Sequence, residues 1–277
     1  MKHLENLIVI AAIIFIASCK NRVESACDDH YINGVNYLLA NDFEKAESEL
    51  QLSLKVNPKN ANSYYELGYC YFYSGNSNNA ITAFDKAVEL NPNFMMAYYA
   101  DGQVKQIEGK SKEAIADYTR AIELKNDFAF AYYTRATEYI AIADAQKAID
   151  DLDKVIKLKP DFYRAFASRA AMKRNIGDIA GAIQDYSEVL RLDKSNIATY
   201  YNRGILYGES KQYKEAIDDL TSAIDLKTTA NSAYLYRGIY EYYLDRKVSA
   251  CTDFTRAQLL NVPKADEYVK KYCVGSK

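Results

Sequence analysis

The sequence predicts an all-α protein in which one pair of helices is repeated along the chain to build a solenoid. Residues 80–92 (AITAFDKAVELNP) are similar to residues 114–126 (AIADYTRAIELKN), and the two strings lie 34 residues apart. From Cys27 onward, seven consecutive blocks of 34 residues follow without an insertion. Repetition at this spacing is typical of solenoids, because one helix pair cannot bury its apolar face without stacking on its neighbours.

The composition narrows the possible classes of function. The 277 residues are 49% hydrophobic and 26% charged, and the net charge is −2. We expect no nucleic-acid partner, because such a partner requires a basic surface. Only two histidines are present and no nucleophile–base or metal-ligand combination is visible, so we predict no enzyme activity, no metal site and no cofactor. The unusual feature is the presence of 26 tyrosines without a tryptophan.

Residues 1–18 have the features of a secretory signal peptide. Lys2 precedes an apolar run over residues 7–17, which is shorter than the roughly 20 residues that a membrane-spanning helix needs. Residues 16–19, Ile-Ala-Ser-Cys, resemble the lipobox of bacterial lipoproteins, which implies that Cys19 is lipidated and becomes the N-terminus. Glu5 departs from the usual positive charge of this region. An uncleaved anchor or an ordinary secretory signal is the alternative.

A lipidated Cys19 predicts tethering to the membrane of a bacterial cell envelope. Two or more acyl chains hold a protein on a bilayer stably, whereas one does so only marginally. Residues 19–26 then provide the modified cysteine and a short polar linker. Lys20, rather than an aspartate, follows the cysteine and favours the outer membrane in a host that has one. The sequence leaves the periplasmic and the external face open.

The blocks share four fixed positions. Position 8 is always Gly or Ala, position 20 is always Ala, position 24 is large and apolar or aromatic, and position 4 is aromatic in six blocks. Small residues at positions 8 and 20 let the helices of a pair approach closely, and large ones at positions 4 and 24 fill the space between pairs. The predicted blocks are 27–60, 61–94, 95–128, 129–162, 163–196, 197–230 and 231–264.

This pattern resembles the tetratricopeptide repeat family, whose period is 34 residues. The resemblance covers residues 27–264 and implies a right-handed α-solenoid of seven repeats. Proline at position 32 of three blocks ends the second helix, whereas Pro263 lies one place late and indicates that the array ends there. Residues 265–277 are too few for another pair, so we predict a capping helix and a tail.

The cysteines predict one disulfide bond. Cys251 lies on the second helix of the last block, and Cys273 lies in the cap, which should run antiparallel to that helix. We therefore predict a Cys251–Cys273 bond, which export to an oxidising compartment would preserve. Cys27 and Cys70 lie too far apart along their helices to bond, and Cys70 is expected in the core. No cysteine pair has the spacing of zinc ligands.

Charged residues recur with the same period. Position 7 is arginine in the last four blocks, and position 23 is aspartate in the last five. Pairing within a block would set Asp101 against Asp117, so we predict that each aspartate binds the arginine of the next block and fixes the stacking register. The predicted pairs are Asp117–Arg135, Asp151–Arg169, Asp185–Arg203, Asp219–Arg237 and, in the cap, Asp253–Lys271.

The family resemblance also implies that first helices line a concave groove, which would bind a protein or peptide. The residues that it places there are Tyr31, Tyr65, Tyr69, Phe72, Tyr73, Tyr99, Gln103, Gln106, Tyr133, Arg174, Tyr201, Tyr242 and Tyr243. Tyrosine suits such a surface because it offers a large area and a hydroxyl at low entropic cost. The competing interpretation is that many of these rings pack between neighbouring helices. Position 5 carries tyrosine where carboxylate-gripping family members use lysine, so a chaperone-tail receptor is not predicted.

The predicted function is therefore a membrane-tethered scaffold that binds a protein or peptide partner. A glycan- or peptidoglycan-binding lipoprotein is the alternative, because tyrosine rings also stack on sugars. A pull-down compared with a glycan array distinguishes the two. The fold resemblance does not identify the partner.

Overall fold

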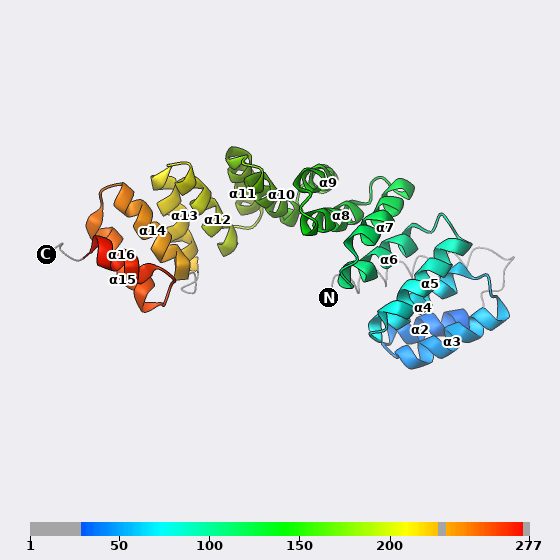
Figure 1. The fold of residues 1–277 in the computed structure, drawn as a ribbon. Helices are drawn as coiled ribbons and strands as arrows, with labels where there is room; N and C mark the ends of the chain where they lie inside the picture. Colours follow the sequence, from blue (N-terminus) through cyan, green and yellow to red (C-terminus); the bar gives the residue numbers. More distant parts are fainter. Residues whose placement is uncertain (1–28, 227–230, 274–277) are drawn as a thin grey trace. The chain divides into compact units, whose positions relative to one another are not determined.

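The computed structural model describes residues 29–226 and 231–273, and all fifteen regular elements in these two ranges are α-helices (Figure 1). The predicted fold class is confirmed, because the described chain is an all-α tandem-repeat solenoid. The predicted signal peptide, the lipidation site Cys19, the linker and Cys27 lie outside the described residues.

The helices belong to two compact units, residues 1–142 (unit 1) and residues 143–277 (unit 2). Each predicted block contains two helices, and the cap that follows the seventh block contains one helix. The helices of unit 1 are α2 (Asp29–Leu39), α3 (Phe43–Val56), α4 (Ala61–Tyr73), α5 (Ser77–Leu90), α6 (Met95–Ile107), α7 (Ser111–Leu124) and α8 (Ala129–Ala141). The helices of unit 2 are α9 (Ala145–Leu158), α10 (Tyr163–Asn175), α11 (Ile179–Leu192), α12 (Ile197–Glu209), α13 (Tyr213–Leu226), α14 (Asn231–Tyr243), α15 (Lys247–Leu259) and α16 (Ala265–Tyr272).

The first helix of every block is followed, at position 15, by a residue in the left-handed conformation. These residues are Asn41, Gly75, Gly109, Ala143, Gly177, Lys211 and Asp245, with φ between 57° and 85°. After α4, the amide of Asn76 donates to the carbonyl of Tyr71 (2.8 Å), as in a Schellman motif. Only three of the seven are glycine, the residue that adopts this conformation without steric cost.

The small and large positions of the repeat pack as the sequence predicts. All seven alanines at position 20 are fully buried. A Cβ added to Gly68 would lie 2.5 Å from the ring of Phe84, and one added to Gly102 would lie 2.7 Å from the ring of Tyr118. Position 8 is therefore small because the large residue at position 24 of the same block occupies the space beside it.

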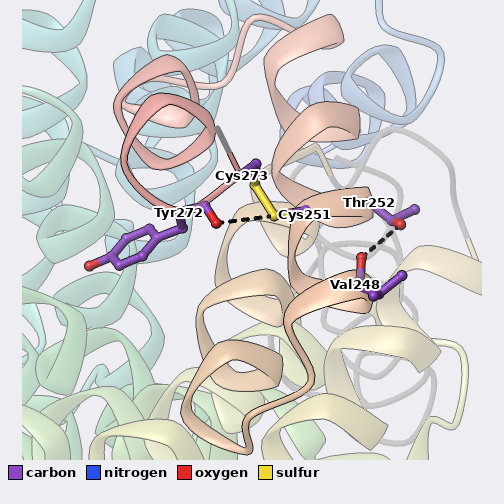
Figure 2. Close-up of a disulfide and its surroundings, with 5 residues drawn as sticks. All are labelled: Val248, Cys251, Thr252, Tyr272 and Cys273. Atoms are coloured by element: carbon purple, nitrogen blue, oxygen red, sulfur yellow. Dashed lines mark hydrogen bonds between the residues drawn. A yellow bond between two sulfur atoms is a disulfide. The ribbon is translucent and has the colours of Figure 1, made fainter. Parts of the chain in front are cut away.

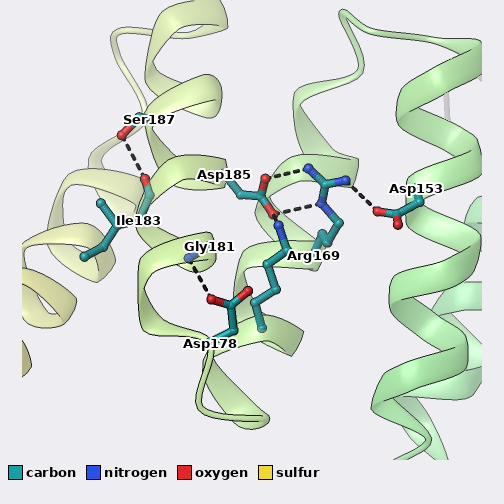
Figure 3. A network of polar contacts seen from close by, with 8 residues as sticks. Asp153, Arg169, Asp178, Gly181, Ile183, Asp185 and Ser187 are labelled. Carbon is teal, nitrogen blue, oxygen red and sulfur yellow. Dashed lines mark hydrogen bonds and ion pairs between the residues drawn. The ribbon is translucent and has the colours of Figure 1, made fainter.

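The charge ladder is present, but the predicted partners are wrong. Arg169 donates from Nε (2.8 Å) and Nη2 (2.6 Å) to Asp185, which lies in its own block (Figure 3). Arg203–Asp219 and Arg237–Asp253 repeat this two-bond geometry. Positions 7 and 23 lie on the two facing helices of one pair, and this proximity decides the pairing.

The contact to the preceding repeat uses the third guanidinium nitrogen. Nη1 of Arg203 donates to Ser187 (2.9 Å), which stands at position 25 of the preceding block. The equivalent partners are Asp153 for Arg169, Thr221 for Arg237 and Thr119 for Arg135. Arg169, Arg203 and Arg237 therefore each link three helices, and the inter-repeat contact goes to position 25 rather than to position 23.

The like-charge pair that argued against pairing within a block is neutralised by a lysine. Lys105 Nζ lies 2.7 Å from Asp101 and 2.8 Å from Asp117, between the two carboxylates. Lys105 stands at position 11, one turn beyond Asp101, so it replaces the missing arginine from a neighbouring position. Asp253 is bound by Arg237, and Lys271 lies over the ring of Tyr272 instead.

The predicted disulfide is present at the C-terminal end of unit 2. Cys251 on α15 is bonded to Cys273, which follows α16 (Figure 2). The rings of Tyr268 and Tyr272 on α16 lie 5.1 Å and 6.1 Å from that of Phe254, which is fully buried. The helix and the bond therefore cover the end of the last repeat. Cys70 is a buried thiol, as predicted, and burial raises its pKa to about 12.

Candidate partner-binding surface

First helices of successive pairs contact one another inside each unit, as α2 and α4, α6 and α8, and α12 and α14 do. Gln106 joins two of them, because its Nε2 donates to Thr137 Oγ1 on α8 (3.0 Å). Its Oε1 accepts from the hydroxyl of Tyr118 on α7 (2.9 Å). The predicted groove residues of these helices thus lie on neighbouring elements, held by side-chain hydrogen bonds.

Four predicted groove tyrosines are in the core instead, which corrects the prediction for Tyr31, Tyr65, Tyr69 and Tyr99. Each is between 5% and 7% exposed. The ring of Tyr65 lies 4.8 Å from that of Phe94 and 5.9 Å from that of Phe84. Tyr65, at position 5, thus packs between the second helix of its own pair and the last residue of its block, and Tyr69, at position 9, also packs on Phe84, at 5.3 Å. For these four residues the competing interpretation is correct.

A second set of residues in unit 1 does reach the surface, and we call it the unit 1 face. Its members are Leu39, Phe72, Tyr73, Gln103, Gln106, Ile107 and Tyr133. Tyr73 is 38% exposed and Ile107 is 64% exposed, whereas Phe72, Gln103, Gln106 and Tyr133 are half-buried. The unit 1 face contains no charged side chain.

An aromatic cluster supports one end of this face. The ring of Tyr73 lies 5.5 Å from that of Phe43 and 5.4 Å from that of Phe72, and it is stacked on Tyr69 at 6.1 Å. Because these neighbours hold the ring from several sides, Tyr73 presents a preformed apolar surface. Rigid aromatic side chains of this kind dominate binding at protein interfaces.

Leu39 and Ile107 are surface residues that the sequence analysis missed. Both stand at position 13, the last residue of a first helix, as Tyr73 does. The sequence pattern could have indicated these residues, because apolar residues recur at position 13 in three consecutive blocks. The helix ends at each of these residues, and both side chains are exposed.

The predicted groove residues of unit 2 lie in a different electrostatic setting. Arg174 is exposed and forms an ion pair with Glu209 on α12. Tyr201 is half-buried beside Tyr236, and Tyr242 lies 4.4 Å from Tyr272. Tyr243 is the most exposed of these rings and is stacked on Tyr213 at 5.1 Å. The unit 2 residues thus combine rings with a charge pair.

Two buried carboxyl groups lie near the first helices of unit 1. Burial raises the pKa of Glu66 on α4 to about 8. Burial also raises the pKa of Asp101 on α6 to about 8, although Lys105 acts against this shift, and the Oδ1 atom of Asp101 has no hydrogen-bond partner. Both groups therefore keep their proton up to a higher pH than a carboxyl group on the surface does.

Neither carboxyl group belongs to a cluster of described residues that could hold a metal ion. Within residues 29–226 and 231–273, no group of three or more His, Cys, Asp and Glu side chains is placed to hold a metal ion. In the same ranges, no helix is long and apolar enough to cross a membrane.

The fold defines a class of protein, the all-α tandem-repeat solenoids. Models described as "Tetratricopeptide repeat" match residues 61–94, 97–128, 131–162 and 197–229. A model described as "TPR repeat" matches residues 172–211. The chain therefore contains tetratricopeptide repeats.

Solved structures support the fold. The C-terminal part of a TPR repeat-containing protein from Cytophaga hutchinsonii has a TM-score of 0.74 at 14% identity, over 86% of this chain and 99% of that one. YrrB, titled a TPR protein with an unusual peptide-binding site, has a TM-score of 0.61 at 21% identity, over 66% of this chain and 95% of that one. MamA has a TM-score of 0.56 at 29% identity, over 58% of this chain and 94% of that one. No curated protein matches the chain.

Proposed function

We propose that this protein is an interaction scaffold that binds a protein or peptide segment through the unit 1 face. One observation carries the proposal, namely a charge-free row of aromatic, aliphatic and amide side chains that reaches the surface on α2, α4, α6 and α8. Apolar area excludes water on binding, and the amide of Gln103 suits the backbone of an extended peptide. The peptide-binding site named for YrrB supports this use of the fold.

We further propose that a lipid on Cys19 tethers the scaffold to the cell envelope, with Lys20 favouring the outer membrane. The disulfide Cys251–Cys273 supports this location, because such bonds persist in oxidising compartments. Globomycin treatment, or the Cys19→Ala variant, should leave an unprocessed precursor. Normal processing in both cases would refute the tether and leave the scaffold proposal intact.

Photocrosslinking in the native membrane tests the binding surface. A photoreactive residue at position 107 should capture a partner, because Ile107 is exposed within the unit 1 face. A photoreactive residue at Val56, which is also exposed but lies on the second helix α3, is the matched control. Equal capture from both positions, or capture from Val56 alone, would place the site elsewhere.

Substitution of the exposed residues completes the test. The Tyr73→Ser, Ile107→Ser double variant should abolish capture and leave the helical signal in circular dichroism unchanged. Replacing Tyr65 or Tyr99 is uninformative for binding, because both rings are in the core. Retention by a glycan array, with no captured protein, would favour the sugar-binding alternative.

A further inference from the structure

The arginines of the ladder have aromatic rings over their guanidinium groups. Arg203 lies 5.6 Å from the ring of Tyr207, and Arg135 lies 5.8 Å from that of Tyr139. In both cases the ring stands at position 11, four residues after the arginine. Guanidinium groups are attracted to aromatic faces at this distance, so the tyrosine at position 11 covers the arginine in its own repeat.

The last repeat lacks this ring, and so does the repeat of Arg169, where Lys173 stands at position 11 and binds Asp185. Position 11 is Glu241, whose carboxylate accepts a hydrogen bond from Arg246 at 3.2 Å. Arg237 keeps the ring of Tyr234 at position 4, at 5.6 Å. Its nitrogens are engaged by Asp253 and Thr221. What the last repeat loses, relative to Arg203, is the tyrosine that covers the guanidinium from position 11.

A hollow of about 310 Å³ lies at this place, between α13, α14 and α15. The residues that line it are Thr221, Arg237, Glu241, Val248, Ser249, Thr252 and Asp253. Val248 and Thr252 can be followed in Figure 2, one turn apart on α15. The preceding repeat carries Lys214, Glu215 and Asp218 where α15 has the short side chains of Val248, Ser249 and Thr252. The missing ring and these shorter side chains together account for the hollow.

We propose that this hollow is a second contact site, which accepts one aromatic side chain from a protein partner. The chain itself supplies the template, because Tyr207 covers the equivalent arginine in the preceding repeat. The volume lies at the lower end of the range of about 300–1,000 Å³ for ligand pockets, which suits one side chain.

The lining selects the chemistry of the occupant. Val248, at 82% exposure, offers an apolar rim, and the hydroxyls of Ser249 and Thr252 can hydrogen-bond to a phenol. Glu241 and Asp253 disfavour an acidic side chain. None of the lining residues stands at a groove position of the repeat, so the site is separate from the unit 1 face and does not depend on it.

N-acetyl-tyrosinamide is the probe for this site, with the Nε–Hε resonances of ¹⁵N-arginine-labelled full chain as the readout. The resonance of Arg237 should move upfield through the ring current, with a dissociation constant in the millimolar range expected for one side chain. Arg203 is the internal control, because Tyr207 already covers it, and its resonance should stay in place. A resonance of Arg237 that does not move in the folded protein would overturn the proposal.

Two variants sharpen the test. Glu241→Tyr gives Arg237 the ring that Arg135 and Arg203 have, and it should weaken the response on the order of tenfold. Val248→Lys introduces the lysine that the preceding repeat carries as Lys214; it lies at an exposed position that cannot disturb the core, and it should also block the probe. Unchanged binding by both variants would overturn the site, as would a response of Arg237 to methyl β-D-glucoside but not to N-acetyl-tyrosinamide.

Discussion

Replacing Arg203 with leucine should destabilise the protein by leaving the carboxylate of Asp219 without its partner. The side chains of Arg203 and Asp219 are 18% and 8% exposed, and two hydrogen bonds of 2.7 Å join them. Removing one member of a buried pair costs about 3–5 kcal/mol. Because Arg203 retains some contact with water, we expect a loss of about 3 kcal/mol, at the lower limit of that range.

A double-mutant cycle distinguishes the observed pairing from the inter-repeat pairing. The Arg203→Leu and Asp219→Asn variants should show a coupling of at least about 1.5 kcal/mol, because the residues are in contact. Arg203→Leu and Asp185→Asn should couple by less than about 0.5 kcal/mol, since Asp185 is held by Arg169 and Lys173.

Urea unfolding followed by far-ultraviolet circular dichroism provides the measurement, with equal m-values required before the free energies are compared. Arg191→Leu is the matched control, because Arg191 is exposed and bonds only to Glu188 one turn away. It should change stability by less than about 0.5 kcal/mol. Stronger coupling of Arg203 to Asp185 than to Asp219 would refute the reasoning.

The remaining predictions concern the disulfide, a buried carboxyl and a close helix contact. Replacing both Cys251 and Cys273 with serine should cost about 3 kcal/mol, because the bond spans 22 residues; equal melting temperatures with and without the bond would contradict this. Glu66 holds its proton in the folded state up to about pH 8 but loses it near pH 4.5 when unfolded, so stability should fall by about 1.4 kcal/mol per unit as the pH rises between these values. Thermal melts of Glu66→Gln from pH 5 to 8 should lack this fall, and parallel curves for both proteins would count against it. Gly68→Ala should cost about 1–3 kcal/mol in urea unfolding, since the new Cβ meets the ring of Phe84, and a neutral effect would show that this contact relaxes freely.

Several features of the fold were accessible from the sequence because they depend on local periodicity. The alanine at position 20 and the small residue at position 8 recur in every block, and both prove to be sites of close helix approach. The disulfide was also predictable, because Cys251 lies on the second helix of the last block and Cys273 lies in the cap that packs against it. In each case the spacing of the residues along the sequence determines which side chains come into contact.

The candidate surface was only partly predictable. Tyrosines at position 5 and apolar residues at position 13 both recur with the repeat period, yet Tyr99 is buried and Ile107 is exposed. Spacing places both on the first helix. Which of them faces water depends on the rings of neighbouring helices, such as Phe128 beside Tyr99.

By itself, the sequence determined the repeat length, the helix pairs and the small-against-large packing, because these follow from residue size at a fixed period. The tertiary structure alone decided that Arg203 binds Asp219 rather than Asp185, and that Lys105 separates Asp101 from Asp117. It also decided that position 15 takes the left-handed conformation even where the residue is Lys211. The physical reason is that ion pairing, burial and backbone strain depend on distances between helices, which a repeat pattern constrains but does not specify.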